Sequence, residues 1–193
     1  MTSYQPYEAP AAEPWQRQVR YEVNDALLRQ APACAVIAPP AADSGALGRA
    51  VEAALGRGLT QRVTRVIQPR ARDRMLRELA LDLGDARSRR WFAGATGCRA
   101  VLDWSLTRDE DAFVVVWAHR AIGVQVALTG PDGAALWRAR HDAWRGDGGL
   151  PLGPVGALTS AAAAARLNQD PELIDSMADD LARRLFATLP DMR

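Results

Sequence analysis

The chain has 193 residues, of which 48% are hydrophobic and 24% are charged, and its formal net charge at pH 7 is +1. This length suits one domain with a sizeable core, and the apolar content argues against general disorder. All 24 basic side chains are arginine, and acidic residues are interleaved with them. A near-neutral chain of this kind does not indicate a nucleic-acid binder with a concentrated basic face.

No apolar run approaches the roughly 18 to 20 residues that a helix needs to cross a bilayer. The first residues, MTSYQP, lack the basic and apolar regions of a secretory signal. We therefore expect either a cytoplasmic protein or a chain from which a leader has been removed, and composition does not separate the two.

The amino-terminal part of the chain carries the weakest pattern. Residues 1 to about 14 are rich in Pro, Ala and Glu and show no periodicity, which predicts an extended arm. The segment 15–30 has apolar residues at both helical and strand spacing, so a short helix and a strand both stay open. We expect residues 1–30 to form this arm and residues 31–193 to form a single α/β domain.

A parallel β-α-β-α-β unit is predicted next. Short apolar runs indicate strands at residues 33–38, 64–67 and 98–106. Helical spacing indicates helices at residues 46–59, 74–83 and 86–95. Asp73 is the expected cap of the second helix, and Gly56 and Gly58 are the expected carboxyl-terminal cap of the first. Right-handed crossovers place the first strand between the other two.

An antiparallel meander extends this unit. The apolar runs 112–130 and 134–144 meet at Gly130-Pro131-Asp132-Gly133, which supplies tight-turn dihedrals. A loop is expected at 146–154, a small-residue helix at 155–167, and a carboxyl-terminal helix at 171–189 capped by Asp170. The predicted fold class is α/β: a mixed sheet with a three-strand parallel portion, an antiparallel meander and a carboxyl-terminal helix. The helices are expected mainly on one face.

Four segments in this order resemble a group of bacterial envelope lipoproteins. They are CAVIAPP, WFAGATGCRAVLDWSL, VALTGPDGAALWRAR and the closing small-residue segment with its helix, together about residues 33–189. The group shares the fold of the curli secretion channel subunit and of the amino-terminal domain of the Tol-Pal propeller protein. Within it, the chain is most similar to small periplasmic lipoproteins that carry a domain of unknown function.

The chain departs from this group in two respects. The family's hairpin turn usually reads Asp-x-x-Thr-Gly before a Leu-Trp pair, whereas Gly130-Pro131-Asp132-Gly133 precedes Leu136-Trp137 here. No lipobox cysteine stands near the start of the sequence. We therefore expect membrane contact only through a lipid anchor that is removed or missing.

The resemblance implies a non-enzymatic, envelope-associated domain on the periplasmic side of the outer membrane. Such a domain is an accessory or structural component of a secretion or surface-assembly system. It acts through protein contacts, including contacts between its own copies, without a cofactor, a metal or nucleic acid.

The cysteines are Cys34 and Cys98, and each begins a strand predicted to be parallel and adjacent to the other. Their Cα atoms are then near the roughly 5.5 to 6 Å that a disulfide requires. One interpretation is a structural bridge in an oxidising periplasm. The alternative is two separate buried thiols. No CxxC motif supports a thioredoxin-like redox role.

Other chemistry has weaker support. His119 and His141, with Asp142 nearby, form a metal site only in principle. The serines lack a GxSxG context. Glycines around the loop at 39–48 leave open a different class of function, a cytoplasmic α/β nucleotide-binding module or small enzyme. The spacing there is not GxGxxG.

The tryptophans suggest a third class, a solute- or glycan-binding domain with an aromatic face. Core positions are expected for Trp91 and Trp137. An apolar patch for a partner is expected from the other strand tryptophans and from the connection at 148–167. The interaction candidates are Trp104, Trp117, Trp144, Leu150, Leu152, Val155 and Leu158.

Overall fold

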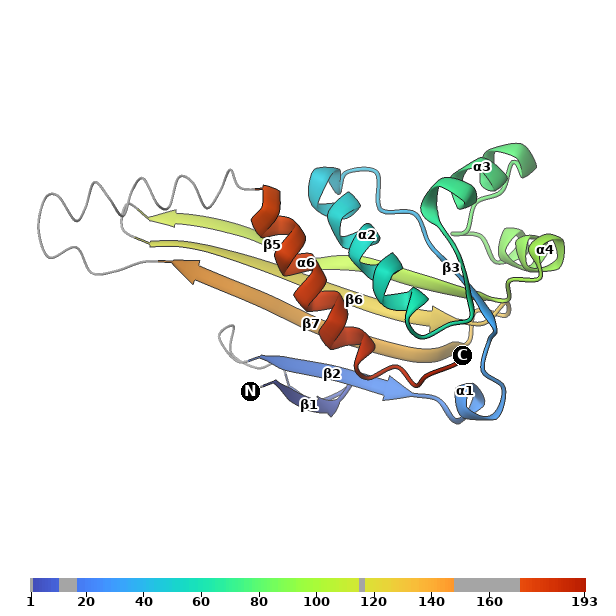
Figure 1. Cartoon of the computed structure of the whole chain (residues 1–193), viewed down its shortest axis with the longest axis horizontal. Helices are drawn as coiled ribbons and strands as arrows, with labels where there is room; N and C mark the ends of the chain where they lie inside the picture. The colour runs from blue at the N-terminus through green and yellow to red at the C-terminus, as the bar shows by residue number, and fades with distance from the viewer. Residues whose placement is uncertain (1, 11–16, 115–116, 148–170) are drawn as a thin grey trace, which may run out of the picture.

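The computed structural model describes the backbone of residues 2–10, 17–114, 117–147 and 171–193, and the side chains of 2–10, 17–107, 121–144 and 172–193. Within these ranges seven strands form one sheet, in the order β1-β2-β7-β6-β5-β3-β4 (Figure 1). The strands are β1 (Ser3–Pro6), β2 (Gln18–Val23), β3 (Cys34–Ile37), β4 (Arg65–Ile67), β5 (Ala100–Val114), β6 (Trp117–Thr129) and β7 (Ala135–Asp147). The helices are α1 (Asp25–Arg29), α2 (Gly45–Thr60), α3 (Pro69–Leu79), α4 (Ala86–Thr96) and α6 (Pro171–Phe186).

The predicted fold class is confirmed. β3 pairs in parallel with both β4 and β5, so it lies between them as right-handed crossovers require. β5, β6 and β7 form the antiparallel meander. The turn between β6 and β7 is the predicted one: Gly133 N donates to Gly130 O at 3.0 Å, and Gly133 has φ +84°, a conformation that glycine adopts without strain.

Both structures left open for residues 15–30 occur in the described part of that segment. β2 comes first, with Val19 opposite His141 of β7, and the short helix α1 follows. The predicted extended arm includes β1, which pairs in parallel with β2. These amino-terminal strands therefore belong to the same sheet as the rest of the chain and form one of its edges.

The prediction for the meander is wrong at one point, the apolar run 112–130. We expected one continuous run there, but β5 extends to Val114 and β6 begins at Trp117, with these two residues paired. β5 also continues past the predicted end at Leu106 through the charged residues 108–111. The length of β5 is set by backbone hydrogen bonds to β6, so it cannot be predicted from which side chains are apolar.

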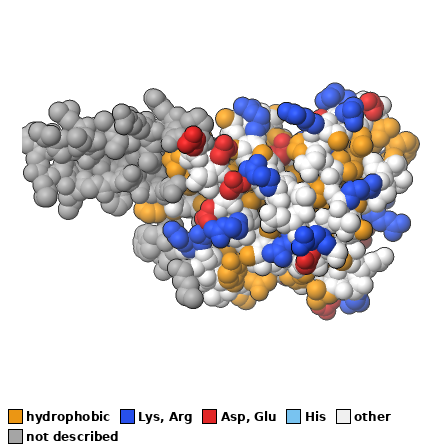
Figure 2. All heavy atoms as spheres, viewed as in Figure 1, with side chains coloured by type: hydrophobic (Ala, Val, Ile, Leu, Met, Phe, Trp, Pro, Cys, Tyr) orange, Lys and Arg blue, Asp and Glu red, His pale blue; other side chains and the backbone are white. Residues whose placement is uncertain are grey.

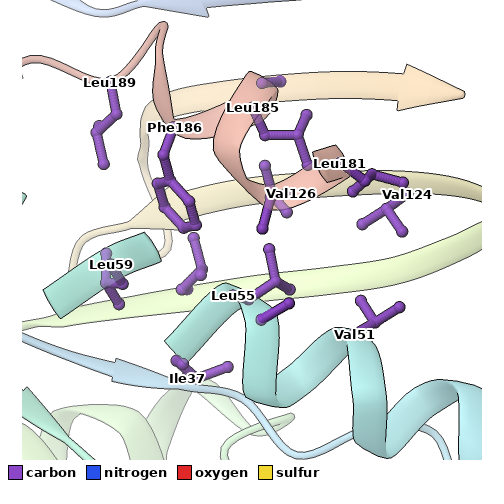
Figure 3. Packing of buried hydrophobic residues seen from close by; sticks show 14 of the residues in the cluster. Ile37, Val51, Leu55, Leu59, Val124, Val126, Leu181, Leu185, Phe186 and Leu189 are labelled. Carbon is purple, nitrogen blue, oxygen red and sulfur yellow. The ribbon is translucent and has the colours of Figure 1, made fainter. Parts of the chain in front are cut away.

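Helices cover both faces of the sheet, contrary to the expectation of mainly one. α2 and α6 lie side by side over one face, where they form the larger core (Figure 1). Figure 3 shows Leu55 and Leu59 of α2 and Phe186 of α6 in this core, beside strand residues such as Val126. On the other face α3 and α4 pack against Val36 and Val101 in a second, smaller core.

The caps predicted for two helices are not the observed ones. α3 begins at Pro69, with Gln68 as its N-cap, because proline is suited to the first turn of a helix. Asp73 therefore lies inside α3 and does not cap it. Gly56 and Gly58 lie inside α2, which ends at Thr60. Within the described residues no helix combines the length and the apolarity of a membrane span.

Gly58 permits the close approach of α2 and α6. A Cβ atom at this position would lie 2.3 Å from Cδ2 of Phe186, whose ring stacks on Trp137 at a centroid distance of 5.8 Å. Any side chain here would displace the Phe186 ring from the centre of the larger core.

We predict that Gly58→Ala lowers the free energy of unfolding by about 1–3 kcal/mol, measured by urea denaturation, because the added methyl overpacks the helix contact. Gly94→Ala in α4 is the matched control, since nothing lies within 4 Å of its added Cβ. That variant should gain about 0.5–1 kcal/mol from the better helix propensity of alanine. A gain of stability in both variants would contradict the prediction.

Candidate functional site

The structure brings Cys34 and Cys98 together in a disulfide, with their Cα atoms 4.8 Å apart. The bridge joins the start of β3 to the residues just before β5, in the smaller core. Arg65 lies beside it: Nε donates to Sγ of Cys34 at 3.2 Å, and Nη2 donates to Thr96 O at 2.8 Å. A bridge that spans 64 positions of sequence stabilises a fold by about 2–4 kcal/mol, chiefly by restricting the unfolded chain.

The tryptophans are distributed differently from the prediction. Trp137 is buried as expected, and its indole donates to Oγ1 of Thr188 at 3.1 Å. Trp104 is half-buried against the larger core and donates to Ala38 O at 2.9 Å, so this interaction candidate does not lie on an open face. Trp91, expected in the core, is 58% exposed. Its neighbour Phe92 takes the inward position on α4.

The remaining interaction candidates divide into two groups. Trp144 is 38% exposed, and together with Ala143 it lines a small cavity beside α6. Outside the described side chains lie Trp117, Leu150, Leu152, Val155 and Leu158.

An apolar patch that sequence reasoning missed lies where α3 leads into α4. Trp91 and Leu79, with exposed fractions of 58% and 37%, flank a shallow pocket of about 220 Å³ that Leu81 and Arg87 also line. Leu79 is the last residue of α3, and the left-handed Ala80 follows it. We call Trp91, Leu79 and Leu81 the α3–α4 patch.

Two arginines tie the helices of the smaller core to the rest of the molecule. Arg89 of α4 binds Asp103 of β5 through two parallel hydrogen bonds of 2.7 and 2.8 Å, and it also donates to Oγ1 of Thr129 at 3.1 Å. Such two-point pairing is a property of the guanidinium fork.

The second arginine, Arg72 of α3, is buried. It donates to Glu52 Oε1 of α2 at 2.6 Å, to Ile37 O at 2.8 Å and to Asp73 Oδ1 at 2.7 Å. The sequence contains no signal that separates this arginine from its exposed neighbours on α3.

A groove of about 910 Å³ lies between α2 and the first turn of α3. The first residue in the sequence that lines this groove is Arg49, which directly follows the loop at 39–48 that was considered for nucleotide binding. Within that loop, Gly48 allows close packing, because a Cβ there would lie 2.0 Å from Oγ of Ser44. The structure therefore gives this glycine a packing role inside the helix start.

His141 of β7 is buried beside a small cavity of about 130 Å³ that Asp180 and Arg184 of α6 also line. Its Nδ1 lies 2.8 Å from Gln18 O of β2. Burial lowers the pKa of His141 and the Arg184 cation lowers it further, while the hydrogen bond to Gln18 acts in the opposite direction. The side chain of His119 is not described. Among the described residues no group of three or more His, Cys, Asp or Glu is placed to hold a metal.

Comparison with known proteins shows a likeness of fold. The sequence matches no protein-family model and no curated protein. PelC from Paraburkholderia phytofirmans, solved as a dodecamer, is 16% identical with a TM-score of 0.50, over 91% of this chain and 98% of that chain. Lipoprotein GNA1162 from Neisseria meningitidis is 17% identical with a TM-score of 0.49, over 71% of this chain and 99% of that chain. The resemblance drawn from the sequence, to the fold of bacterial envelope lipoproteins, is confirmed as a resemblance of fold.

We predict that the stability of the protein falls as the pH drops below about 6.5, in part through His141. The unfolded chain takes up a proton at the ordinary histidine pKa, whereas the buried ring takes it up only at lower pH. Urea denaturation between pH 7.5 and 5 should show a steeper loss for the wild type than for His141→Gln, which does not titrate in this range. Equal slopes in the two proteins would contradict the prediction.

Proposed function

We propose that this chain is a non-enzymatic component of the bacterial cell envelope that acts through protein contacts, including contacts between its own copies. The observation that carries the proposal is the disulfide between Cys34 and Cys98. Disulfides persist in oxidising compartments such as the periplasm and are rare in the cytosol, where thiols are kept reduced.

The fold supports self-assembly. PelC, which has the same fold, was solved as a dodecamer. The α3–α4 patch is the surface we propose for contacts between copies, because large apolar side chains that gather on a surface mark interaction sites. Arg87 at its border supplies a polar rim of the kind that surrounds such contacts.

The more specific role that we propose is that of an accessory or structural part of a secretion or surface-assembly system. The resemblance to envelope lipoproteins supports it. The ionisable groups also support a structural role, because Arg72 of α3 is paired with Glu52 of α2 and Arg89 of α4 is paired with Asp103 of β5.

The disulfide provides the test of location. In cells of the natural host, rapid denaturation with a thiol-reactive mass tag should leave the protein untagged, and reduction before tagging should add two tags, because both cysteines are bonded. The variant Cys34→Ala is the control, since its remaining Cys98 should take one tag without reduction. Two tags on the unreduced wild type would contradict an oxidising location.

Self-assembly is tested by light scattering after size-exclusion chromatography. The wild type should have a mass several times the 20.9 kDa of one chain, and Trp91→Glu should shift it toward one chain because a carboxylate cannot be buried in an apolar contact. Leu28→Glu is the matched control, since Leu28 is 66% exposed on α1, outside the patch. A wild type with the mass of one chain would contradict assembly, and equal effects of both variants would contradict the patch.

A further inference from the structure

The groove between α2 and α3 is a second feature of the surface, and the proposed protein contacts do not use it. Along α2 it is lined by Ala53 and Gly56, whose lack of long side chains keeps the groove open. Gln68 and Arg70 line it at the start of α3. Its volume of about 910 Å³ lies within the range of ligand-binding clefts. In Figure 2, basic side chains lie over α2 and α3 on the face shown.

The charges that line the groove are only partly balanced. Glu52 and Asp73 are both paired with the buried Arg72. Arg57 is paired with Asp179 of α6 at 2.7 Å. Two further exposed cations, Arg49 and Arg70, line the groove without an ion pair in the part of the chain that the structure describes.

The first turn of α3 adds to this positive potential. Its N-cap, Gln68, makes no side-chain capping hydrogen bond, and its Nε2 lies 3.5 Å from Oγ1 of Thr60 on α2. The amino terminus of a helix carries a partial positive charge that favours anions. The uncapped helix start and the two unpaired guanidiniums therefore border the same groove.

We propose that this groove binds a phosphate monoester, with Arg49 and Arg70 as its principal ligands. A phosphate monoester carries a charge of about −1.5 to −2 near neutral pH, which matches two unpaired guanidiniums, and its oxygens accept the paired donors of arginine. A carboxylate would balance only one of the two cations. The phosphate belongs either to a small soluble molecule or to a lipid headgroup. This inference does not depend on the proposed function.

The test measures binding of two probes to the full chain. Calorimetry with glycerol 3-phosphate detects a soluble phosphate monoester. Flotation with phosphatidylcholine vesicles, with and without phosphatidic acid, detects the same group on a lipid. Arg49→Ala/Arg70→Ala should weaken binding at least about tenfold, the size expected from losing a charge-assisted contact. Arg74→Ala/Arg77→Ala removes the same charge from exposed positions of α3 outside the groove and should retain binding.

Ala53→Glu provides an independent variant, since it places a carboxylate on the wall of the groove at an exposed position and should abolish binding. Flotation that requires phosphatidic acid would assign a headgroup, and calorimetric binding without flotation would assign a soluble ligand. Either result supports the proposal if the groove variants lose it. Absence of binding to both probes, or equal loss in the two double-arginine variants, would overturn it.

Discussion

The fold depends on one constraint: β3 is buried on both of its faces. Ala35 and Ile37 face the larger core under α2 and α6, while Cys34 and Val36 face the smaller core under α3 and α4. A strand in this position needs a hydrogen-bonded neighbour on each side and a helical layer above and below. The parallel pairing with β4 and β5 and the two helical layers meet this need, and the disulfide at Cys34 lies in the smaller core.

Two arginines make the ion pairs that join the helices near α3 and α4 to the rest of the fold. Arg72 donates hydrogen bonds to the carboxylate of Glu52 and to the carbonyl of Ile37 in β3. Arg89 donates two parallel hydrogen bonds to the carboxylate of Asp103. The pair of Arg72 and Glu52 is the more buried of the two, so removing one partner would leave the other charged and desolvated. Arginine suits these two positions better than lysine, because its planar guanidinium group donates to several acceptors at once.

The surface shows why the site was harder to predict than the fold. Trp91 and Phe92 are neighbours of similar apolarity, yet one is 58% exposed and the other is buried. Their sequence context favours a core position for both, and only the phase of α4 against the sheet separates them. The groove between α2 and α3 depends in the same way on where α3 begins. The helix begins at Pro69 and not after Asp73, and Arg70 in its first turn therefore lines the groove beside α2.

Local patterns of period, turn residue and strand length in the sequence predicted the α/β class, the position of β3 between β4 and β5, the Gly130–Gly133 turn and the carboxyl-terminal helix. The sequence also placed Cys34 and Cys98 near one another through the parallel pairing of their strands. The extent of β5, the helical cover on both faces, the burial of Arg72 and the outward position of Trp91 came from packing between distant segments. Each of these features depends on which distant segment packs against a residue, and that contact cannot be predicted from the residue's neighbours in the sequence.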